Sequence, residues 1–199
     1  LTSALDASLI LNLPIISSPM DTVTESEMAY TMDSLGGLGI IHRYNSIEEQ
    51  AGLVAEVINA GATNVGAAVG ISGDYFERAQ TLVENGASVI CVDVAHGHHI
   101  LMKDVLGILK KSFGDSVHIM AGNVATLEGI NDLAQWGANS VRCNIGGGSI
   151  CSTRIQTGHG LPGLQTIFDC AQTEHDVAII ADGGIRTAGD IVKALAAGA

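Results

Sequence analysis

The chain has 199 residues, of which 47% are hydrophobic, 15% charged and only 4% aromatic, and its formal net charge is -12. This length and hydrophobic content predict a globular chain with a sizeable core and exclude a disordered one. The negative charge makes a nucleic-acid backbone an unfavourable partner, although backbone N–H groups can still bind a small anionic ligand locally.

Seven short apolar runs recur along the chain, and each is followed by a loop and then by a stretch with helical periodicity. The runs carry Val, Ile and Ala on both faces, which is typical of strands that are buried on both sides. The predicted strands are residues 13–17, 38–42, 64–69, 89–94, 117–121, 140–145 and 178–181. The predicted helices are residues 25–35, 47–60, 75–84, 100–113, 127–135, 164–173 and 188–197.

This strict alternation predicts a parallel α/β fold. We expect a (β/α)8 TIM barrel that is truncated at both ends, with residues 1–199 forming a single catalytic domain that lacks the eighth strand. A doubly wound sheet is the alternative, because alternation alone does not separate the two architectures. In a barrel, the groups that bind ligands follow directly after each strand, and the polar and glycine-rich segments of this chain fall at those positions.

The loop Gly-Gly-Gly-Ser-Ile-Cys-Ser-Thr-Arg at residues 146–154 is the first candidate site. Its glycines allow the backbone to approach a ligand closely, and a serine hydroxyl with nearby N–H groups can hold a phosphate. Cys151 follows that cradle and could act as a nucleophile. The alternative is a glycine-rich turn followed by a half-buried cysteine.

Two further strand ends carry candidate groups. Asp182-Gly183-Gly184 offers a carboxylate for a vicinal diol and glycines for a phosphate, or else a cap for the next helix. The segment from Asp93 to His99 contains three histidines; a metal site is conceivable there, but adjacent histidines do not all converge, so a polar loop that holds a ribose or a ring is favoured. Asn123 follows the next strand, where its amide can bind a carboxamide or tighten a turn.

Residues 18–22, Ser-Pro-Met-Asp-Thr, follow the first predicted strand. We expect Thr24 to cap the next helix, with Glu27 completing a capping box. Cys91, Cys143 and Cys170 are predicted to be core residues, which leaves Cys151 as the reactive thiol. The absence of a Cys-x-x-Cys pair, of a signal peptide and of a long apolar span predicts a reducing, cytoplasmic location without membrane contact.

Seven motifs together resemble the IMP dehydrogenase and GMP reductase family, in the family's order and over nearly the whole chain. They are Ser-Ser-Pro-Met-Asp-Thr-Val-Thr-Glu at 17–25, Gly-Gly-Leu-Gly-Ile-Ile-His at 36–42, Val-Gly-Ala-Ala-Val-Gly at 65–70, Asp-Val-Ala-His-Gly-His at 93–98, Ala-Gly-Asn-Val-Ala-Thr at 121–126, Gly-Ser-Ile-Cys-Ser-Thr-Arg at 148–154 and Ala-Asp-Gly-Gly-Ile-Arg at 181–186.

The resemblance implies a barrel, usually a homotetramer, that oxidises IMP to XMP with NAD or reduces GMP to IMP and ammonia with NADPH. It implies that Cys151 attacks purine C2 and that Thr153 lies beside the reacting centre. The implied substrate-binding residues are Ser18, Met20, Ser149, Asp182, Gly183 and Gly184. The implied cofactor-binding residues are Asp93, Asn123 and Arg142, and the implied potassium ligands are the backbone carbonyls of Gly146, Gly148 and Cys151.

The chain departs from the family pattern at several positions. Asn144 and Gly147 stand where the family usually has glycine and proline, and Gly163 stands where a glutamine is usual. The segment Thr157-Gly158 is similar to the reductases. Residues 46–70 leave no room for the regulatory tandem domain that most dehydrogenases insert, and we expect the mobile flap with its arginine–tyrosine pair to be absent.

The strand-end motifs favour a dehydrogenase over a reductase. A non-catalytic nucleotide-binding barrel is the alternative from a different class, motivated by the expected truncation and the altered Gly147 loop. A flavin-dependent barrel is a third alternative.

Overall fold

A computed structural model describes all 199 residues, which divide into two compact units. The first unit contains residues 1–93 and 108–119, and the second contains residues 94–107 and 120–199. The boundary passes through α4 (Ile100–Phe113) and β7 (His118–Val124), so both elements contribute to both units. No helix is both long enough and apolar enough to span a membrane.

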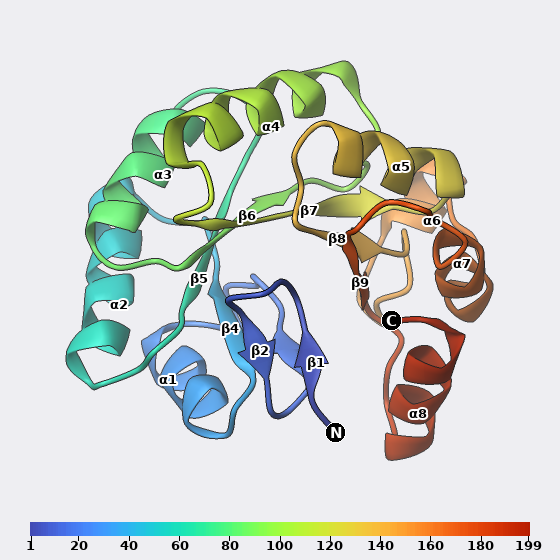
Figure 1. The fold of residues 1–199 in the computed structure, drawn as a ribbon, viewed down its shortest axis with the longest axis horizontal. Coiled ribbons are helices and arrows are strands. Elements are labelled where there is room, and N and C mark those ends of the chain that lie inside the picture. Colours follow the sequence, from blue (N-terminus) through green and yellow to red (C-terminus); the bar gives the residue numbers. More distant parts are fainter. The chain divides into compact units, whose positions relative to one another are not determined.

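The first unit is built on four parallel strands that follow one another in chain order (Figure 1). They are β3 (Ile16–Ser17), β4 (Leu38–Ile41), β5 (Gly66–Val69) and β6 (Val89–Asp93). The helices that alternate with them are α1 (Ser26–Ser34), α2 (Ile47–Asn59) and α3 (Tyr75–Glu84). The start of β7 lies beside β6, where the His118 N–H donates to the Ser88 carbonyl at 3.0 Å.

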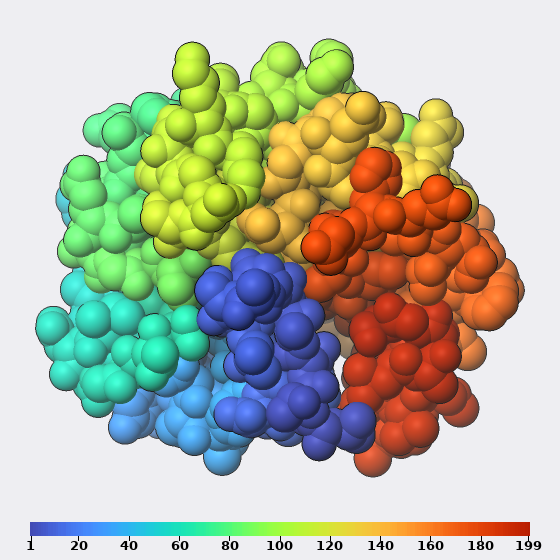
Figure 2. Space-filling view, viewed as in Figure 1, coloured from blue at the N-terminus to red at the C-terminus, as the bar shows by residue number.

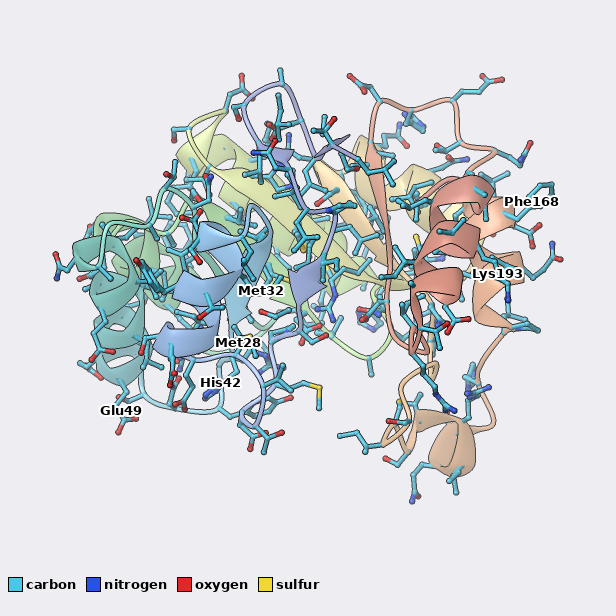
Figure 3. All side chains as sticks on the ribbon, turned by 90° about the horizontal axis from the view of Figure 1, so that it is seen from below. Met28, Met32, His42, Glu49, Phe168 and Lys193 are labelled. Carbon is cyan, nitrogen blue, oxygen red and sulfur yellow. The ribbon has the colours of Figure 1, made fainter.

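Small residues allow the helices of this unit to pack closely on the strands. A Cβ atom placed on Gly39 of β4 would lie 2.5 Å from the Cα of Ala29 on α1, so only glycine permits this approach. Met32, labelled on α1 in Figure 3, is buried, whereas Met28 on the same helix is exposed. All four residues of β4 and of β5 are buried, as the apolar runs on both faces predict.

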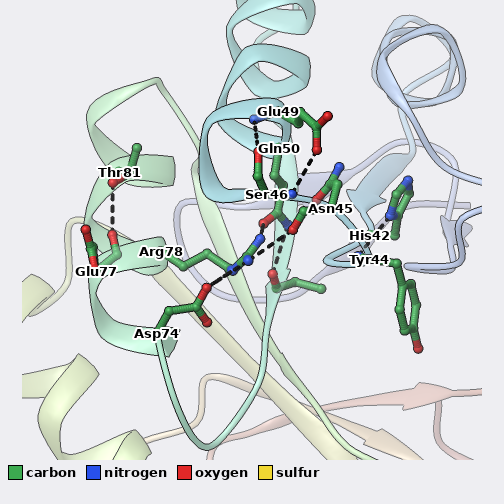
Figure 4. Close-up of polar contacts among 11 residues, drawn as sticks. His42, Tyr44, Asn45, Ser46, Glu49, Gln50, Asp74, Glu77, Arg78 and Thr81 are labelled. Atoms are coloured by element: carbon green, nitrogen blue, oxygen red, sulfur yellow. Dashed lines mark hydrogen bonds and ion pairs between the residues drawn. The ribbon is translucent and has the colours of Figure 1, made fainter.

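A buried arginine ties two helices of the first unit to the sheet (Figure 4). Arg78 on α3 donates to Asp74 Oδ2 and to Gln50 Oε1, each at 2.8 Å, and to the Asn45 carbonyl at 3.1 Å. Gln50 on α2 in turn donates to the Ala68 carbonyl of β5 at 2.9 Å. The guanidinium therefore supports the starts of α2 and α3, and its charge is neutralised by Asp74.

A short hairpin precedes the barrel-type strands and was not predicted. It pairs β1 (Ser3–Ala4) with β2 (Ile10–Leu11) in antiparallel fashion and lies at the surface of the first unit (dark blue in Figure 2). Asp6 in its turn accepts hydrogen bonds from the Ser8 and Leu9 N–H groups, and its other oxygen contacts His118 Nδ1 at the start of β7. This contact anchors the hairpin to the sheet.

The second unit contains the remainder of β7, followed by β8 (Ser140–Cys143) and β9 (Ala178–Ala181), again parallel and in chain order. Its helices are α5 (Leu127–Gln135), α6 (Thr153–Thr157), α7 (Gly163–Cys170) and α8 (Ala188–Ala197). The five-residue α6 was not predicted, and α7 is shorter than the predicted segment 164–173.

Serine and threonine side chains begin several helices, but not α1. Ser46 and Glu49 form a reciprocal capping box on α2, and Thr187 and Asp190 form another on α8. The capping box predicted for Thr24 and Glu27 is wrong. Thr24 is fully buried, and its hydroxyl donates to the Ser18 carbonyl at 2.7 Å, so it holds the turn after β3 and cannot reach the helix end.

The α/β fold class is confirmed, with seven parallel strands that alternate with helices. Strand order follows chain order within each unit, as in a (β/α) barrel, whereas a doubly wound sheet reverses its order. The bounds of α3, α4, α5, α8 and β9 agree with the prediction. The single catalytic domain over residues 1–199 stays a prediction.

Candidate active site

The loop between β8 and α6 carries the candidate nucleophile. Cys151 is half-buried, and its Sγ lies 3.2 Å from Thr153 Oγ1 at the start of α6. The Thr153 hydroxyl and backbone N–H, as hydrogen-bond donors to the thiolate, lower the pKa of Cys151 below its usual range, and the nearby Arg154 charge acts in the same direction. Cys151 is thus a half-buried thiol with a lowered pKa, and its role as the reactive cysteine stays a prediction.

The other three cysteines are buried, as predicted. A hydrogen bond with the Cys170 thiol, together with burial, raises the pKa of the Cys143 thiol well above its usual range. The same hydrogen bond lowers the pKa of the Cys170 thiol, so burial is the feature that the two cysteines share as core residues.

Asp182, directly after β9, collects donors from two neighbouring strands. Its Oδ2 accepts a hydrogen bond from Arg142 Nη2 of β8 at 2.9 Å and a second from Asn123 Nδ2 of β7. The Asp182 side chain is 20% exposed, and the Arg142 side chain is 10% exposed. The alternative that Asp182 caps the next helix is wrong, because Thr187 and Asp190 cap α8.

The two glycines that follow this carboxylate bring two loops into backbone contact. Gly183 and Gly184 have φ angles of +77° and +76°, which a residue with a side chain rarely adopts. A Cβ atom on Gly183 would lie 2.9 Å from the Gly148 N atom, and one on Gly184 would lie 3.2 Å from the Gly147 carbonyl oxygen. The cysteine loop therefore packs directly against the Asp182-Gly183-Gly184 turn.

A cavity of about 340 Å³ opens beside this contact, a volume that suits a small ligand. Lys193 of α8, labelled in Figure 3, contributes to its wall. The lining residues are Asn144, Gly147, Arg154, Leu161, Gly163, Leu164, Ile167, Ala181, Asp182, Gly183, Gly184, Ile185, Asp190, Lys193 and Ala194. Of the predicted substrate-binding residues, Asp182, Gly183 and Gly184 belong to this lining, and Ser149 lies exposed on the adjoining loop.

The histidines after β6 point to different partners. His98 Nε2 lies 2.8 Å from Asp132 Oδ2, and His99 Nδ1 accepts a hydrogen bond from the Leu101 N–H at the start of α4. The His96 ring lies 6.4 Å from that of His159, and burial lowers the pKa of His96 below its usual range. His98 and His99 thus fix the loop and the helix start.

The predicted residues of the first unit lie after their strands. Ser18 and Met20 belong to the turn after β3, where the Ser18 carbonyl accepts from the Met20 N–H at 2.8 Å. Asp93 ends β6, and its carbonyl accepts a long hydrogen bond from Arg43 at 3.4 Å. Their contacts with substrate or cofactor stay predictions.

Asn144 is a site residue that sequence reasoning did not assign, although its departure from glycine was visible. It follows β8 with φ +115°, is 5% exposed, and donates from Nδ2 to the Asp182 carbonyl at 2.9 Å. Its own carbonyl accepts a hydrogen bond from Asn123 Nδ2 at 2.9 Å. Asn144 therefore connects the ends of all three strands of the second unit.

The family model described as the IMP dehydrogenase / GMP reductase domain matches residues 1–199. The chain belongs to the IMP dehydrogenase and GMP reductase family. It is 30% identical to the inosine-5'-monophosphate dehydrogenase of Nitrosopumilus maritimus, over the whole chain and 68% of that protein. It is also 45% identical to the GMP reductase of Leishmania major, over 81% of this chain and 34% of that protein.

The chain spans only part of the length of these family members. It covers 60% of the inosine-5'-monophosphate dehydrogenase of Cryptosporidium parvum, to which it is 37% identical. The alignment with the Nitrosopumilus maritimus enzyme extends over 324 positions, against 199 residues here. That enzyme therefore carries additional segments within the matched region.

Proposed function

We propose that this protein is a purine-nucleotide oxidoreductase that oxidises IMP to XMP with NAD through a covalent adduct on Cys151. The observation that carries the proposal is the activated Cys151 thiol, on a glycine loop that packs against Gly183 and Gly184 beside the Asp182 carboxylate. Family membership supports the same chemistry, because two of the matched proteins are named as dehydrogenases of this nucleotide.

In the proposed reaction, the Cys151 thiolate attacks purine C2 and forms a carbon–sulfur bond. NAD, when bound, would supply the acceptor for the hydride that leaves C2, and the adduct on Cys151 is then a thioimidate. Water then adds to C2, XMP is released, and the thiolate is regenerated with loss of one proton. The Thr153 hydroxyl lies 3.2 Å from the sulfur, so it can stabilise the thiolate both before the attack and after its release.

The remaining roles follow from the chemistry of each group. Asp182 binds the ribose diol, since both of its observed hydrogen bonds reach Oδ2 and Oδ1 can accept from a ligand. In the second unit, Ser149, Gly183 and Gly184 bind the phosphate, Asn123 contacts the nicotinamide riboside, and Arg142 orients Asp182. For the first unit, the roles proposed from the family pattern are a phosphate contact for Ser18, a base contact for Met20 and a nicotinamide riboside contact for Asp93.

The donor set of the cysteine loop fits a potassium ion. The proposed ligands are the backbone carbonyls of Gly146, Gly148 and Cys151, and backbone carbonyls are the ligands that replace water around alkali cations. The Gly148 carbonyl also accepts from the Cys151 N–H at 3.2 Å, which closes a turn between two of the proposed ligands. We further propose that the protein assembles as a homotetramer, which light scattering on the purified protein would test.

The second candidate is reduction of GMP to IMP and ammonia with NADPH. The 45% identity to the Leishmania major GMP reductase favours it, as does Thr157-Gly158 after the cysteine loop. In that reaction Cys151 attacks C2, ammonia leaves with a proton, and a hydride that NADPH would supply is added to the same carbon. The carbon–sulfur bond then breaks, which releases IMP and the thiolate.

A paired absorbance assay separates these candidates. The protein is given IMP with NAD in one cell and GMP with NADPH in the other, and reduced nicotinamide is followed in both. A rise in the first cell supports the dehydrogenase, and a fall in the second supports the reductase. Mass spectrometry after an acid quench tests whether the peptide that contains Cys151 carries the nucleotide.

Cys151→Ala is expected to abolish turnover while nucleotide binding is retained. The matched control is Cys170→Ala, which removes a buried thiol of the same unit and should leave turnover of the folded protein intact. If nucleotide binds, neither cell shows turnover and Cys151→Ala changes nothing, the protein is a non-catalytic nucleotide-binding barrel.

A further inference from the structure

The carboxamide of Asn144 occupies a space that two glycines leave open. A Cβ atom on Gly147 would lie 1.9 Å from Asn144 Nδ2, and one on Gly163 would lie 2.9 Å from the same atom. Gly147 belongs to the cysteine loop and Gly163 begins α7. No residue with a side chain fits at position 147 while Asn144 keeps this rotamer.

Asn144 holds this position at a cost in stability. Its φ of +115° lies in the region that favours glycine. Its Oδ1 is buried without a hydrogen-bond partner, and burying an unpaired acceptor is unfavourable. The compensating contact is the hydrogen bond from Nδ2 to the Asp182 carbonyl, which fixes the carboxamide between the cysteine loop and the end of β9.

We infer that Asn144 is a positioning residue for Cys151. Gly147 packs against the Asn144 side chain. Gly147 precedes Gly148, whose carbonyl accepts a hydrogen bond from the Cys151 N–H. The carboxamide therefore sets the path of the loop that presents the thiol to Thr153, and it couples this path to the carbonyl of Asp182. The inference rests on the proposed function only in treating Cys151 as the nucleophile.

A double-mutant cycle between Asn144→Gly and Gly147→Ala tests this coupling. The readout is the rate at which iodoacetamide alkylates Cys151 at pH 7, followed on its peptide; the other three cysteines are buried. Gly147→Ala alone is expected to slow alkylation by about tenfold, because the added methyl displaces the loop from Thr153.

Asn144→Gly alone removes the side chain against which Gly147 packs and is expected to slow alkylation as well. In the double variant the alanine methyl enters the vacated space, so alkylation returns to within about threefold of the wild-type rate. A purely structural role for Asn144 would lower the unfolding free energy but would leave the alkylation rate of Cys151 in the folded protein unchanged.

Gly107→Ala serves as the control, since nothing lies within 4 Å of its added Cβ, and it should show no coupling with Asn144→Gly. If Gly147→Ala does not fold, Gly163→Ala is a milder probe of the same contact, at 2.9 Å. The inference is overturned if the effect of the double variant on the alkylation rate equals the product of the two single-variant effects to within about twofold, because independent sites are additive in free energy. Coupling without turnover of IMP or GMP would leave Asn144 as the positioning residue and reject only the proposed reaction.

Discussion

Arg78 in the first unit and Arg142 in the second are both buried arginines that pair with an aspartate. Arg78 binds Asp74, Gln50 and the Asn45 carbonyl, all of which belong to helices or to the residues just before them (Figure 4). Arg142 donates to Asp182, a strand-end residue that also lines the cavity. The two arginine side chains are buried alike, but the Asp74 side chain is 48% exposed and that of Asp182 is 20% exposed. A buried arginine can therefore support folding or orient a group at a cavity, and the surroundings of its aspartate indicate which.

The largest expected effect comes from removing the structural arginine. Arg78→Leu leaves the fully buried Gln50 and the Asn45 carbonyl without their donor, and each buried acceptor left unpaired costs about 1–3 kcal/mol of unfolding free energy. The lost pair with Asp74 adds less, because the Asp74 side chain is 48% exposed. Urea unfolding measures this loss. Alkylation of Cys151 in the folded variant should match wild type, and a slower rate would show that the first network also serves the site.

The control for this prediction is an exposed ion pair of the same unit. Lys110 Nζ lies 2.8 Å from Asp115 Oδ1, but the Asp115 side chain is 97% exposed. Lys110→Ala is therefore expected to change the unfolding free energy by less than about 1 kcal/mol.

The next effect concerns the aspartate that faces the cavity. Asp182→Asn keeps the shape but removes the charge that Arg142 and Asn123 orient, and it weakens the hydrogen bonds to a ribose. We expect the affinity for IMP or GMP to fall by roughly tenfold to a hundredfold, the range for a lost charged hydrogen bond. Equilibrium titration measures it.

Asp74→Asn provides the matched comparison, because this aspartate pairs with Arg78 in the other network. It should weaken folding and leave the nucleotide affinity unchanged. If both substitutions reduce the affinity alike, the distinction between the two arginine networks fails.

A smaller effect is expected at Thr153, whose hydroxyl lowers the pKa of Cys151. Thr153→Val removes this donor, so the thiol pKa should rise toward its ordinary value and alkylation at neutral pH should slow by about fivefold, the worth of one hydrogen bond. Thr157→Val is the control, because the Thr157 hydroxyl donates to the Thr153 carbonyl and has no contact with the sulfur. An equal effect of both variants would mean that α6 as a whole lowers the pKa.

The regular parts of the fold could be predicted from the sequence, and the reason is periodicity. Helices such as α3 and α5 present apolar residues at helical spacing, and their bounds agree with the prediction. The hairpin of residues 3–11 and the five-residue α6 are too short to show a period. The predicted Thr24 cap was wrong because the Thr24 hydroxyl donates to the Ser18 carbonyl in a buried turn. Burial of this kind depends on tertiary structure and cannot be read from the local sequence.

The candidate site also contains residues that the sequence could predict and residues that it could not. Cys151 and Asp182 could be proposed because a thiol and a carboxylate beside glycines have obvious chemistry. The role of Asn144 could not be predicted from the sequence, because it depends on the space beside Gly147 and Gly163. These glycines lie 3 and 19 positions further along the chain. A departure from a family pattern becomes interpretable only when the structure shows which atoms fill the space.

A third pair, between the buried His118 and the partly exposed Asp6, extends the comparison to two groups whose pKa values are both shifted. Burial acts to raise the pKa of Asp6, but hydrogen bonds from His118 and Ser8 outweigh it and lower the pKa to about 2. Burial lowers the pKa of His118 despite the opposing effect of Asp6. Both residues therefore bind protons less readily in the folded chain than in the unfolded chain.

The sign of the pH dependence follows from these two directions. Where the unfolded state binds more protons, stability falls as the pH falls. The contribution of His118 is present above its unfolded pKa near 6.5 and is lost below it; that of Asp6 is present above pH 4 and is lost as the pH falls toward 2. Asp6→Asn is expected to cost only about 1 kcal/mol at pH 7, since the carboxylate is partly exposed, and to flatten the stability curve between pH 4 and pH 2.

Urea unfolding at a series of pH values measures this curve, with Asp132→Asn as the counterpart in the second unit. Asp132 contacts His98 at 2.8 Å, but both side chains are more than a quarter exposed, so its removal should change stability less than that of Asp6. Because Asp6 is the residue that joins the N-terminal hairpin to β7, its substitution should also increase hydrogen exchange in residues 3–11 before the rest of the first unit. An unchanged exchange pattern would mean that Leu5, Leu9 and Leu11, which are all buried, hold the hairpin without the ion pair.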